Sequence, residues 1–218
     1  NKLIQEGTEC KKIAYSTPKY IITKGKTIIE NTELQIFGDH NLQNLNAAKI
    51  VCNELGVSDT IFYKKISTFK GASNRLELIK TAAESSIYKD FAHSPSKLEA
   101  TSYAMKKQFK NRKLVACLEL HTFSSLNTEF LMQYKDCMNI PDIAIVYLNP
   151  SNITAKKLKP ITKEQIHKAF NRKNLLFFSN LNKLESYLKS LNWKNKNLLM
   201  MSSGNFNNMN IKEIIKKD

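Results

Sequence analysis

Two short stretches, Ile143-Ala144-Ile145-Val146-Tyr147 and Leu175-Leu176-Phe177-Phe178, decide the fold class, because each is a run of apolar and aromatic residues without a charge. Strands of parallel sheets, which helices cover on both faces, read this way, whereas half-exposed strands alternate apolar and polar residues. On either side of them the sequence alternates strand and helix patterns. Strands are expected at Lys113–Leu120, Asp142–Leu148, Asn174–Phe178 and Asn197–Ser202, and helices at Ser96–Phe109, Thr128–Met138, Thr162–Phe170 and Asn182–Leu191. This alternation predicts a Rossmann-like α/β domain from about residue 86 to the end.

The preceding residues follow a different pattern, of short β segments and then two helices. Strands are expected at Lys12–Tyr15, Tyr20–Thr23, Thr27–Glu30, Glu33–Phe37, Leu76–Thr81 and Ile87–Phe91, and helices at Asn41–Leu55 and about Asp59–Ser67. The small, polar segment Ala82–Ser86 is typical of a linker. We therefore expect two units, residues 1–85 and 86–218.

The composition is strongly basic. The chain has 218 residues, with 34 Lys and Arg against 19 Asp and Glu, and a formal net charge of +15. Such a charge attracts nucleic acid, membrane surfaces or anionic small molecules, and it also fits a solvated, lysine-rich surface. Only Arg75, Arg112 and Arg172 are arginines, and this scarcity argues against sequence-specific reading of DNA bases. No apolar run approaches the roughly 20 residues of a membrane span, so no membrane association is expected.

Several familiar signatures are absent. The sequence has no GxxxxGK[ST] phosphate loop, no GxGxxG and no GxSxG. Cys10, Cys52, Cys117 and Cys137 lack CxxC spacing, which predicts buried, reduced thiols of a cytoplasmic protein and no metal site within the chain. His167 is expected on a solvated helix face. The chain starts at Asn1 without a Met, so we expect a segment of a longer protein.

Polar residues at the ends of the expected elements are the candidates for a site. Asn41 and Asn44 lie three apart in the first turns of a helix, where amides can pair with the edge of an adenine or simply cap the helix. Arg75 precedes an apolar run and could meet a phosphate or pair with Glu77 on the surface. Asp90 and His93 follow a strand, where ligands bind in open α/β sheets, although both could be structural.

Two further polar segments follow strands of the expected sheet. They are Glu119–Ser125, which holds His121, Ser124 and Ser125, and Ser202–Phe206, which holds Asn205. Because parallel strands end at one edge of a sheet, both segments are expected on the same side of the domain. They are candidates for substrate binding.

The ordered set of motifs resembles the Mur ligase family. It runs from Gly38-x-His40-Asn41-x-x-Asn44 with Ala47-Ala48, through Phe69-Lys70-Gly71-x-x-x-Arg75-Leu76-Glu77, to Asp90-Phe91-Ala92-His93-x-Pro95. The resemblance covers nearly the whole chain and implies that residues 1–85 are the last part of an ATP-binding central domain and residues 86–218 the C-terminal Rossmann-like domain. It is closest to the branch that joins UDP-N-acetylmuramate to the peptide L-alanyl-γ-D-glutamyl-meso-diaminopimelate in peptidoglycan recycling.

The resemblance also implies roles for the candidate residues. ATP would turn a substrate carboxylate into an acyl phosphate, which an amine attacks to form an amide. His40, Asn41 and Asn44 would flank the adenine, Asp90 would lie near the ribose, and Arg75 and His93 would act at the phosphates. The magnesium ligands, the phosphate loop and the UDP-binding domain would lie upstream of Asn1, so the chain alone is expected to be inactive.

Departures from the family pattern leave alternatives open. Asn74 stands where relatives have a second arginine, Ser94 follows His93 where relatives often have a second histidine, and Glu119–Ser125 lacks the usual Pro and Arg. The nearest alternative is a UDP-N-acetylmuramate–L-alanine ligase, with folylpolyglutamate synthetases more remote. A basic nucleic-acid-binding module and a non-catalytic descendant are the alternatives of other classes, although no nucleic-acid partner is expected on the leading interpretation.

Overall fold

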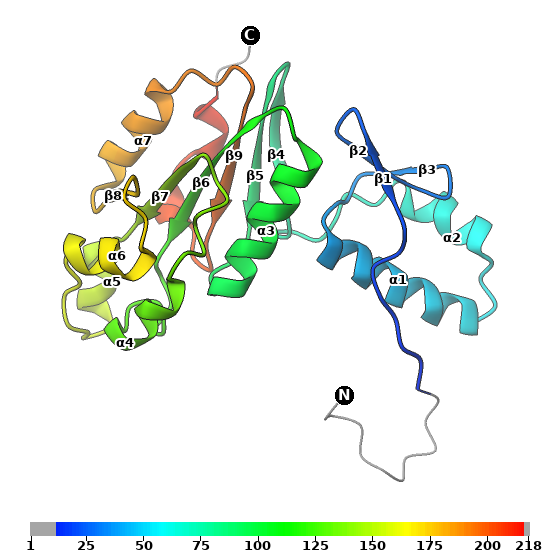
Figure 1. Cartoon of the computed structure of the whole chain (residues 1–218), viewed down its shortest axis with the longest axis horizontal. Coiled ribbons are helices and arrows are strands. Elements are labelled where there is room, and N and C mark those ends of the chain that lie inside the picture. Colours follow the sequence, from blue (N-terminus) through cyan, green and yellow to red (C-terminus); the bar gives the residue numbers. More distant parts are fainter. Residues whose placement is uncertain (1–11, 216–218) are drawn as a thin grey trace.

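The computed structural model describes residues 12–215 and divides them between two sheets (Figure 1). The first is a small antiparallel meander of β1 (Ile21–Thr23), β2 (Lys26–Ile29) and β3 (Thr32–Leu34). Two helices follow it, α1 (Asp39–Glu54) and α2 (Asp59–Ile66). A cluster of apolar side chains joins these elements: Ile29, Leu34, Leu42, Leu45, Phe62 and Tyr63.

The second sheet has six strands in the order β4-β5-β9-β6-β7-β8. They are β4 (Glu77–Ala82), β5 (Ser85–Asp90), β6 (Lys113–Glu119), β7 (Ile143–Tyr147), β8 (Leu176–Phe178) and β9 (Lys196–Met201). All pairings are parallel except that of β4 with β5. The helices are α3 (Pro95–Gln108), α4 (Thr128–Leu131), α5 (Pro150–Ala155), α6 (Lys163–Phe170) and α7 (Leu181–Ser190). The predicted parallel α/β domain is confirmed.

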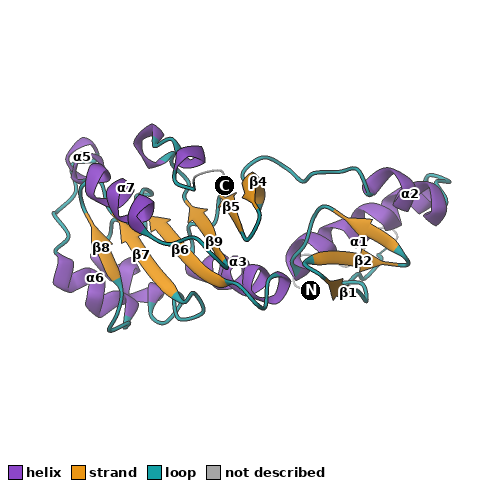
Figure 2. Cartoon of the chain, turned by 90° about the horizontal axis from the view of Figure 1, so that it is seen from above, coloured by secondary structure: helices purple, strands orange, loops and turns teal. Residues whose placement is uncertain are grey.

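The continuous apolar runs are strands covered on both faces. In β6, Leu114, Ala116 and Leu118 pack on the face of α3 and α6, whereas Val115 and Cys117 pack on the face of α7. Figure 2 shows α3 and α6 on one side of the strands and α7 on the other. Burial on both sides removes the polar alternation that a half-exposed strand would show.

Some predicted elements were wrong. Lys12–Tyr15 lies outside any strand. Ile13 and Tyr15 are exposed, so their side chains gain no burial that would favour pairing with a sheet. The helix expected at Thr128–Met138 ends at Leu131 and continues only as a 3₁₀ turn, Met132–Tyr134, because Asp136 adopts a left-handed conformation (φ 64°). Helix α5 was not predicted.

The expected linker at Ala82–Ser86 is instead a β-hairpin. Ala82 and Ser85 are partners across the turn between β4 and β5. The strand before the predicted boundary therefore belongs to the same sheet as the strands after it. The division of the chain into domains at residues 85 and 86 stays a prediction, and this boundary falls inside the hairpin.

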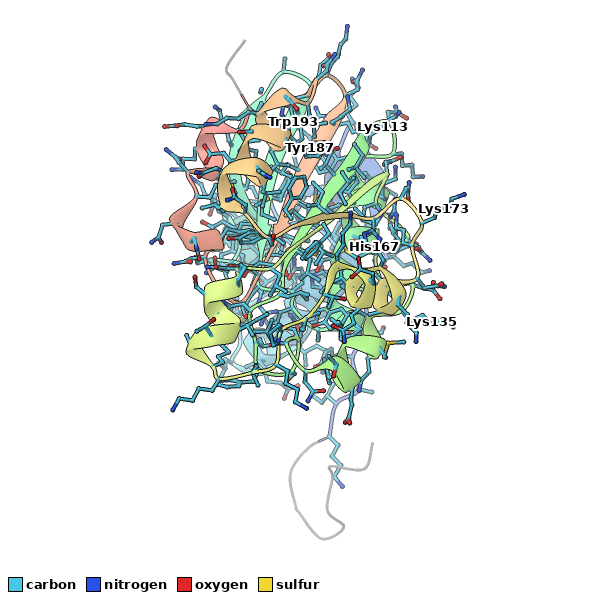
Figure 3. All side chains as sticks on the ribbon, turned by 90° about the vertical axis from the view of Figure 1, so that its left-hand side faces the viewer. Lys113, Lys135, His167, Lys173, Tyr187 and Trp193 are labelled. Carbon is cyan, nitrogen blue, oxygen red and sulfur yellow. The ribbon has the colours of Figure 1, made fainter. Side chains whose placement is uncertain are left out.

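Cysteine and histidine burial was predicted only in part. Cys117 and Cys137 are buried free thiols, Cys52 is half-buried, and Cys10 lies outside the described residues. The prediction for His167 was wrong: this side chain is half-buried on α6, and its Nε2 atom is enclosed without a hydrogen-bond partner (Figure 3). By contrast, Lys113, Lys135 and Lys173 are exposed, as expected of a solvated basic surface.

Candidate functional site

The first turn of α1 is fixed against α3 by a glycine. Gly38 has a φ of 89°, and a Cβ at this position would lie 2.8 Å from the Cβ of Ala104. Only glycine adopts this conformation freely and leaves room for such a close approach. The turn places His40, Asn41 and Asn44 along one side of α1.

These three side chains line a pocket of about 440 Å³. Asn41 donates from Nδ2 to the Phe37 carbonyl (3.0 Å), whereas its Oδ1 atom has no hydrogen-bond partner among residues 12–215. The pocket combines these polar groups with an apolar wall, as an aromatic base would require. Its other lining residues are Ile36, Leu45, Ala48, Ile66, Phe69, Gly71, Ala72 and Arg75.

The loop before β4 brings Arg75 to this pocket in an unusual backbone conformation. Asn74 and Leu76 on either side both have positive φ angles, 55° and 45°. Glu77 accepts hydrogen bonds from the Asn74 amide (2.8 Å) and the Ser73 hydroxyl (3.2 Å). The carboxylate of Glu77 thus stabilises the loop itself, and the surface pair between Arg75 and Glu77 does not form.

Arg75 differs from the other two arginines. The guanidinium of Arg112 binds Asn197 and Ala83, and that of Arg172 binds the carbonyls of Met138 and Asp142. Arg75 is exposed, and its guanidinium has no hydrogen bond or ion pair to any residue between 12 and 215. A free guanidinium beside a pocket is suited to a phosphate or carboxylate ligand.

Asp90 ties the Arg75 loop to the large sheet. This residue ends β5 and is 3% exposed. Its two oxygens accept from the backbone N–H groups of Leu76 and Ala92, each at 2.7 Å. Burial raises the pKa of the Asp90 carboxyl, against the opposing effects of these hydrogen bonds and of the charges on His40 and Arg75. Asp90 is therefore a structural anchor of the site.

The two histidines near Asp90 differ in their surroundings: His40 is affected by burial and by nearby charges, whereas the His93 ring is oriented by a hydrogen bond. Burial lowers the pKa of His40, and Arg75 adds to that effect while the carboxylates of Asp90 and Asp39 oppose it. His93 Nδ1 lies 2.8 Å from the Phe91 carbonyl, and since a carbonyl only accepts, the Nδ1 atom carries the proton. The Nε2 atom of His93 has no hydrogen-bond partner among residues 12–215.

The second group of candidates lies at the carboxyl ends of β6 and β9. Glu119, which ends β6, is 1% exposed and accepts from the Ser202 hydroxyl (2.5 Å) and the Phe206 amide (2.9 Å). The Ser202 amide in turn donates to the Asp90 carbonyl (3.0 Å). The ends of β5, β9 and β6 are thus linked, as the parallel sheet predicted.

The four predicted substrate-binding residues have different environments here. His121 is held by Asn152 of α5 (3.1 Å between Nδ1 and Nδ2). Ser125 is buried, and its hydroxyl exchanges hydrogen bonds with Thr122. Ser124 and Asn205 are exposed. Sequence reasoning passed over Glu119 and Asn152 as site residues, although an acid at the end of a buried strand was a usable signal.

No cluster of three or more His, Cys, Asp or Glu side chains that could hold a metal ion occurs in residues 12–215. Within the same residues, no helix is long and apolar enough to cross a membrane.

Comparisons with known proteins place this geometry in context. No family model matches the chain. A UDP-N-acetylmuramate–L-alanine ligase of Sulfurihydrogenibium is 33% identical over 178 residues, which are 78% of this chain and 37% of the ligase. The chain thus spans well under half of the length of that relative.

Two solved structures from Thermotoga maritima share the fold. A UDP-N-acetylmuramate–alanine ligase matches with a TM-score of 0.65 and 17% identity, over 87% of this chain and 42% of that one. A MurF ligase in complex with ADP matches with a TM-score of 0.60 and 18% identity, over 85% and 42%. The two structures show the shared fold, and the similarity in sequence to the curated relatives supports the Mur ligase family for this chain, without deciding the member of the family.

Proposed function

We propose that this chain is the C-terminal portion of an ATP-dependent ligase that joins UDP-N-acetylmuramate to L-alanyl-γ-D-glutamyl-meso-diaminopimelate through an acyl phosphate, in peptidoglycan recycling. The observation that carries the proposal is the free guanidinium of Arg75 beside the pocket of His40, Asn41 and Asn44. Residues 1–85 would belong to the ATP-binding central domain and residues 86–218 to the C-terminal domain.

In this proposal the pocket holds the nucleotide. An apolar wall with amide groups suits the adenine, and ADP in a structure of similar fold is compatible with this. Arg75 would stabilise the charge that develops on the transferred phosphoryl group, and the Nε2 atom of His93 would contact the nucleotide or substrate near the phosphates. Asp90 would hold the Arg75 loop from its buried position, which makes its part at the ribose an indirect one. ATP brings the phosphoryl group, and Mg²⁺ would be held by residues outside positions 12–215.

The acceptor would meet the edge that carries His121, Ser124, Ser125 and Asn205. An acyl phosphate is destroyed by water, so the two units would have to enclose it during the reaction. The partners of the protein would then be the nucleotide-linked sugar and a cell-wall peptide, both found in the cytoplasm.

A second candidate is the addition of L-alanine in place of the peptide. It is favoured by the names of the curated relatives, since ligases of Sulfurihydrogenibium and Persephonella marina at 33% and 30% identity are both L-alanine ligases. The departures in Glu119–Ser125 do not decide between the two acceptors.

The experiment uses the full-length ligase with ATP, UDP-N-acetylmuramate and either the tripeptide or L-alanine. We expect ADP release coupled to amide formation with the tripeptide, and a kcat about 100-fold lower for Arg75→Gln, because a charge contact to the transition state is lost. Lys135→Gln, an exposed and remote control, should match the wild type. No amide product with either acceptor, or full activity of Arg75→Gln, would contradict the proposal, and amide formation by residues 1–218 alone would contradict their expected inactivity.

A further inference from the structure

Helix α5 is joined to the loop after β6 by two side-chain contacts. Asn152 and Lys156 lie four residues apart and therefore on the same face of this segment. Asn152 contacts His121 (3.1 Å between Nδ2 and Nδ1), and the Lys156 ammonium lies 5.2 Å from the centre of the Phe123 ring. The two contacts connect the loop after β6 to α5 and to the residue that follows α5, at the carboxyl edge of the sheet.

Phe123 lies in a turn that hydrogen bonds between Thr122 and Ser125 stabilise. Phe123 is 64% exposed. The loop around it is closed by hydrogen bonds between Thr122 and Ser125, including one of 2.9 Å between their hydroxyls. Phe123 thus presents its ring to the Lys156 ammonium, and the ring attracts this cation without neutralising its charge.

The two neighbouring loops carry no lysine or arginine. Residues 120–127 after β6 and residues 202–211 after β9 contain neither Lys nor Arg. The acidic side chain between these loops, Glu119, is buried and accepts hydrogen bonds from Ser202 and Phe206. A carboxylate ligand at this edge would therefore find its cation at the end of α5 and not on either loop.

We propose that Lys156, held over Phe123, is a specificity-determining residue that binds a free carboxylate of the amine acceptor. The inference rests on the proposed ligase function, and it applies to both candidate acceptors, because an amino acid and a peptide each present a carboxylate. Lys156 would supply the positive charge for this carboxylate, because the loop after β6 contains no lysine or arginine. The contact between Asn152 and His121 keeps α5 close enough for one acceptor to reach both elements.

Steady-state kinetics of the full-length ligase test this assignment. Lys156→Gln should raise the KM for the acceptor roughly 10-fold, because a charge-assisted hydrogen bond is lost, and leave the KM for ATP unchanged. Lys156→Arg should restore most of the affinity. Lys157→Gln, which removes the neighbouring charge, is the matched control and should behave like the wild type. An acceptor with its carboxylates converted to amides should bind the wild type as weakly as the free acid binds Lys156→Gln.

The outcomes separate this inference from the proposed function. An unchanged acceptor KM in Lys156→Gln, or a retained preference of that variant for the free acid, would overturn the inference while ligase activity stands. If the wild type forms no amide, the proposed function fails, and NMR titration of the 218-residue chain with the tripeptide decides the inference. A shift of the Phe123 ring signals that is lost in Lys156→Gln would support the carboxylate site, and the absence of any shift would overturn it.

Discussion

At the scale of single residues, the protonation of His40 couples the candidate site to stability. Burial lowers the pKa of His40 in the folded chain below its ordinary value of 6.5. Between the two values the unfolded chain binds more protons, so the contribution of His40 to stability is present above pH 6.5 and is lost as the pH falls toward the lowered pKa.

We therefore predict that His40→Gln removes part of the acid sensitivity of folding. The unfolding free energy of the wild type minus that of the variant should fall as the pH is lowered from 7.5 to 5, by at most about 1.4 kcal/mol per pH unit. Urea titrations monitored by tryptophan fluorescence at several pH values measure it. Parallel pH profiles of the two proteins would contradict the assigned state of His40.

Residue roles at the site were foreseeable in part. The positions of His40, Asn41, Asn44 and Arg75 in ordered motifs predicted a shared site, and all four do line one pocket. The bond from the Ala92 amide to Asp90 is local, but the bond from the Leu76 amide was not foreseeable, because it depends on the loop in which Asn74 and Leu76 have positive φ angles.

At the scale of elements, the junction of α1 with α3 depends on the absence of a side chain at Gly38. Gly56, which ends α1, has a similar φ of 82° but nothing within 4 Å of an added Cβ. The two glycines therefore separate backbone strain from steric overlap. Gly38→Ala introduces both backbone strain and a steric overlap with Ala104, whereas Gly56→Ala introduces backbone strain alone.

We predict that Gly56→Ala lowers the unfolding free energy by about 1 kcal/mol, the cost of a left-handed alanine. Gly38→Ala should lower it by a further 1–3 kcal/mol, roughly the cost of overpacking against Ala104. Chemical unfolding of the two variants and the wild type gives the comparison. Equal losses at the two positions would show that α3 yields to the added methyl group.

Element boundaries were less predictable than element types. Helix α5 was missed because Pro150–Ala155 is short and opens with Pro and Ser, which also begin loops. The hairpin at residues 82–86 was read as a linker for a related reason: small polar residues serve in both, and only the pairing of β4 with β5 distinguishes them. Long helices with regular apolar spacing, such as α1 and α3, were located to within a few residues.

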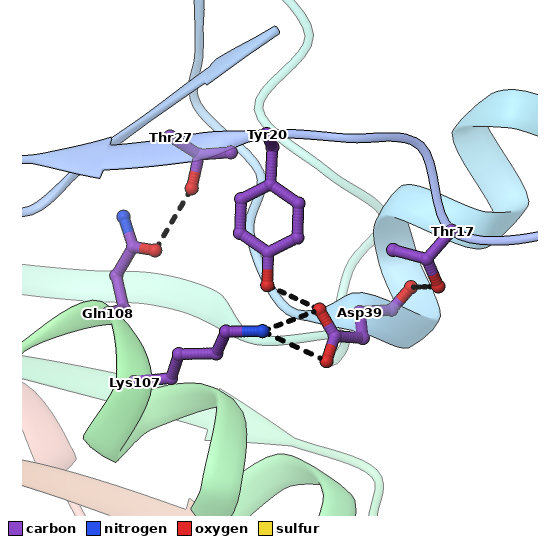
Figure 4. Close-up of polar contacts among 6 residues, drawn as sticks. All are labelled: Thr17, Tyr20, Thr27, Asp39, Lys107 and Gln108. Carbon is purple, nitrogen blue, oxygen red and sulfur yellow. Dashed lines mark hydrogen bonds and ion pairs between the residues drawn. The ribbon is translucent and has the colours of Figure 1, made fainter.

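At the scale of the whole molecule, the C-terminal turn of α3 joins the large sheet layer to the small meander and to α1 through polar side chains (Figure 4). Lys107 binds Asp39 (3.1 Å), which also accepts from the Tyr20 hydroxyl. Gln108 accepts from the buried Thr27 hydroxyl (2.9 Å) and donates to the Gly25 carbonyl (2.7 Å). One helix end thus contacts both the meander and the start of α1.

We predict that the Thr27–Gln108 hydrogen bond stabilises the fold more than the Lys107–Asp39 ion pair does. Thr27→Val keeps the shape of a fully buried side chain but leaves the Gln108 carbonyl without its donor, and should cost roughly 1–3 kcal/mol. Asp39→Asn weakens a partly exposed ion pair and should cost less than about 1 kcal/mol. Unfolding titrations measure both losses, and hydrogen exchange at the end of α3 should increase more in Thr27→Val. A larger effect of Asp39→Asn would mean that the ion pair dominates the junction.

The sequence by itself determined the α/β class, the parallel sheet and the grouping of the candidate site residues, because these follow from local apolar patterns and from the ends of strands. Only the tertiary structure decided which polar groups remain free for a ligand. Glu77, Asp90, Arg112 and Arg172 are taken up by internal hydrogen bonds, whereas Arg75 has no such partner in residues 12–215 and Lys156 rests on Phe123. Hydrogen bonds between distant residues depend on how elements pack, and no local pattern records that packing.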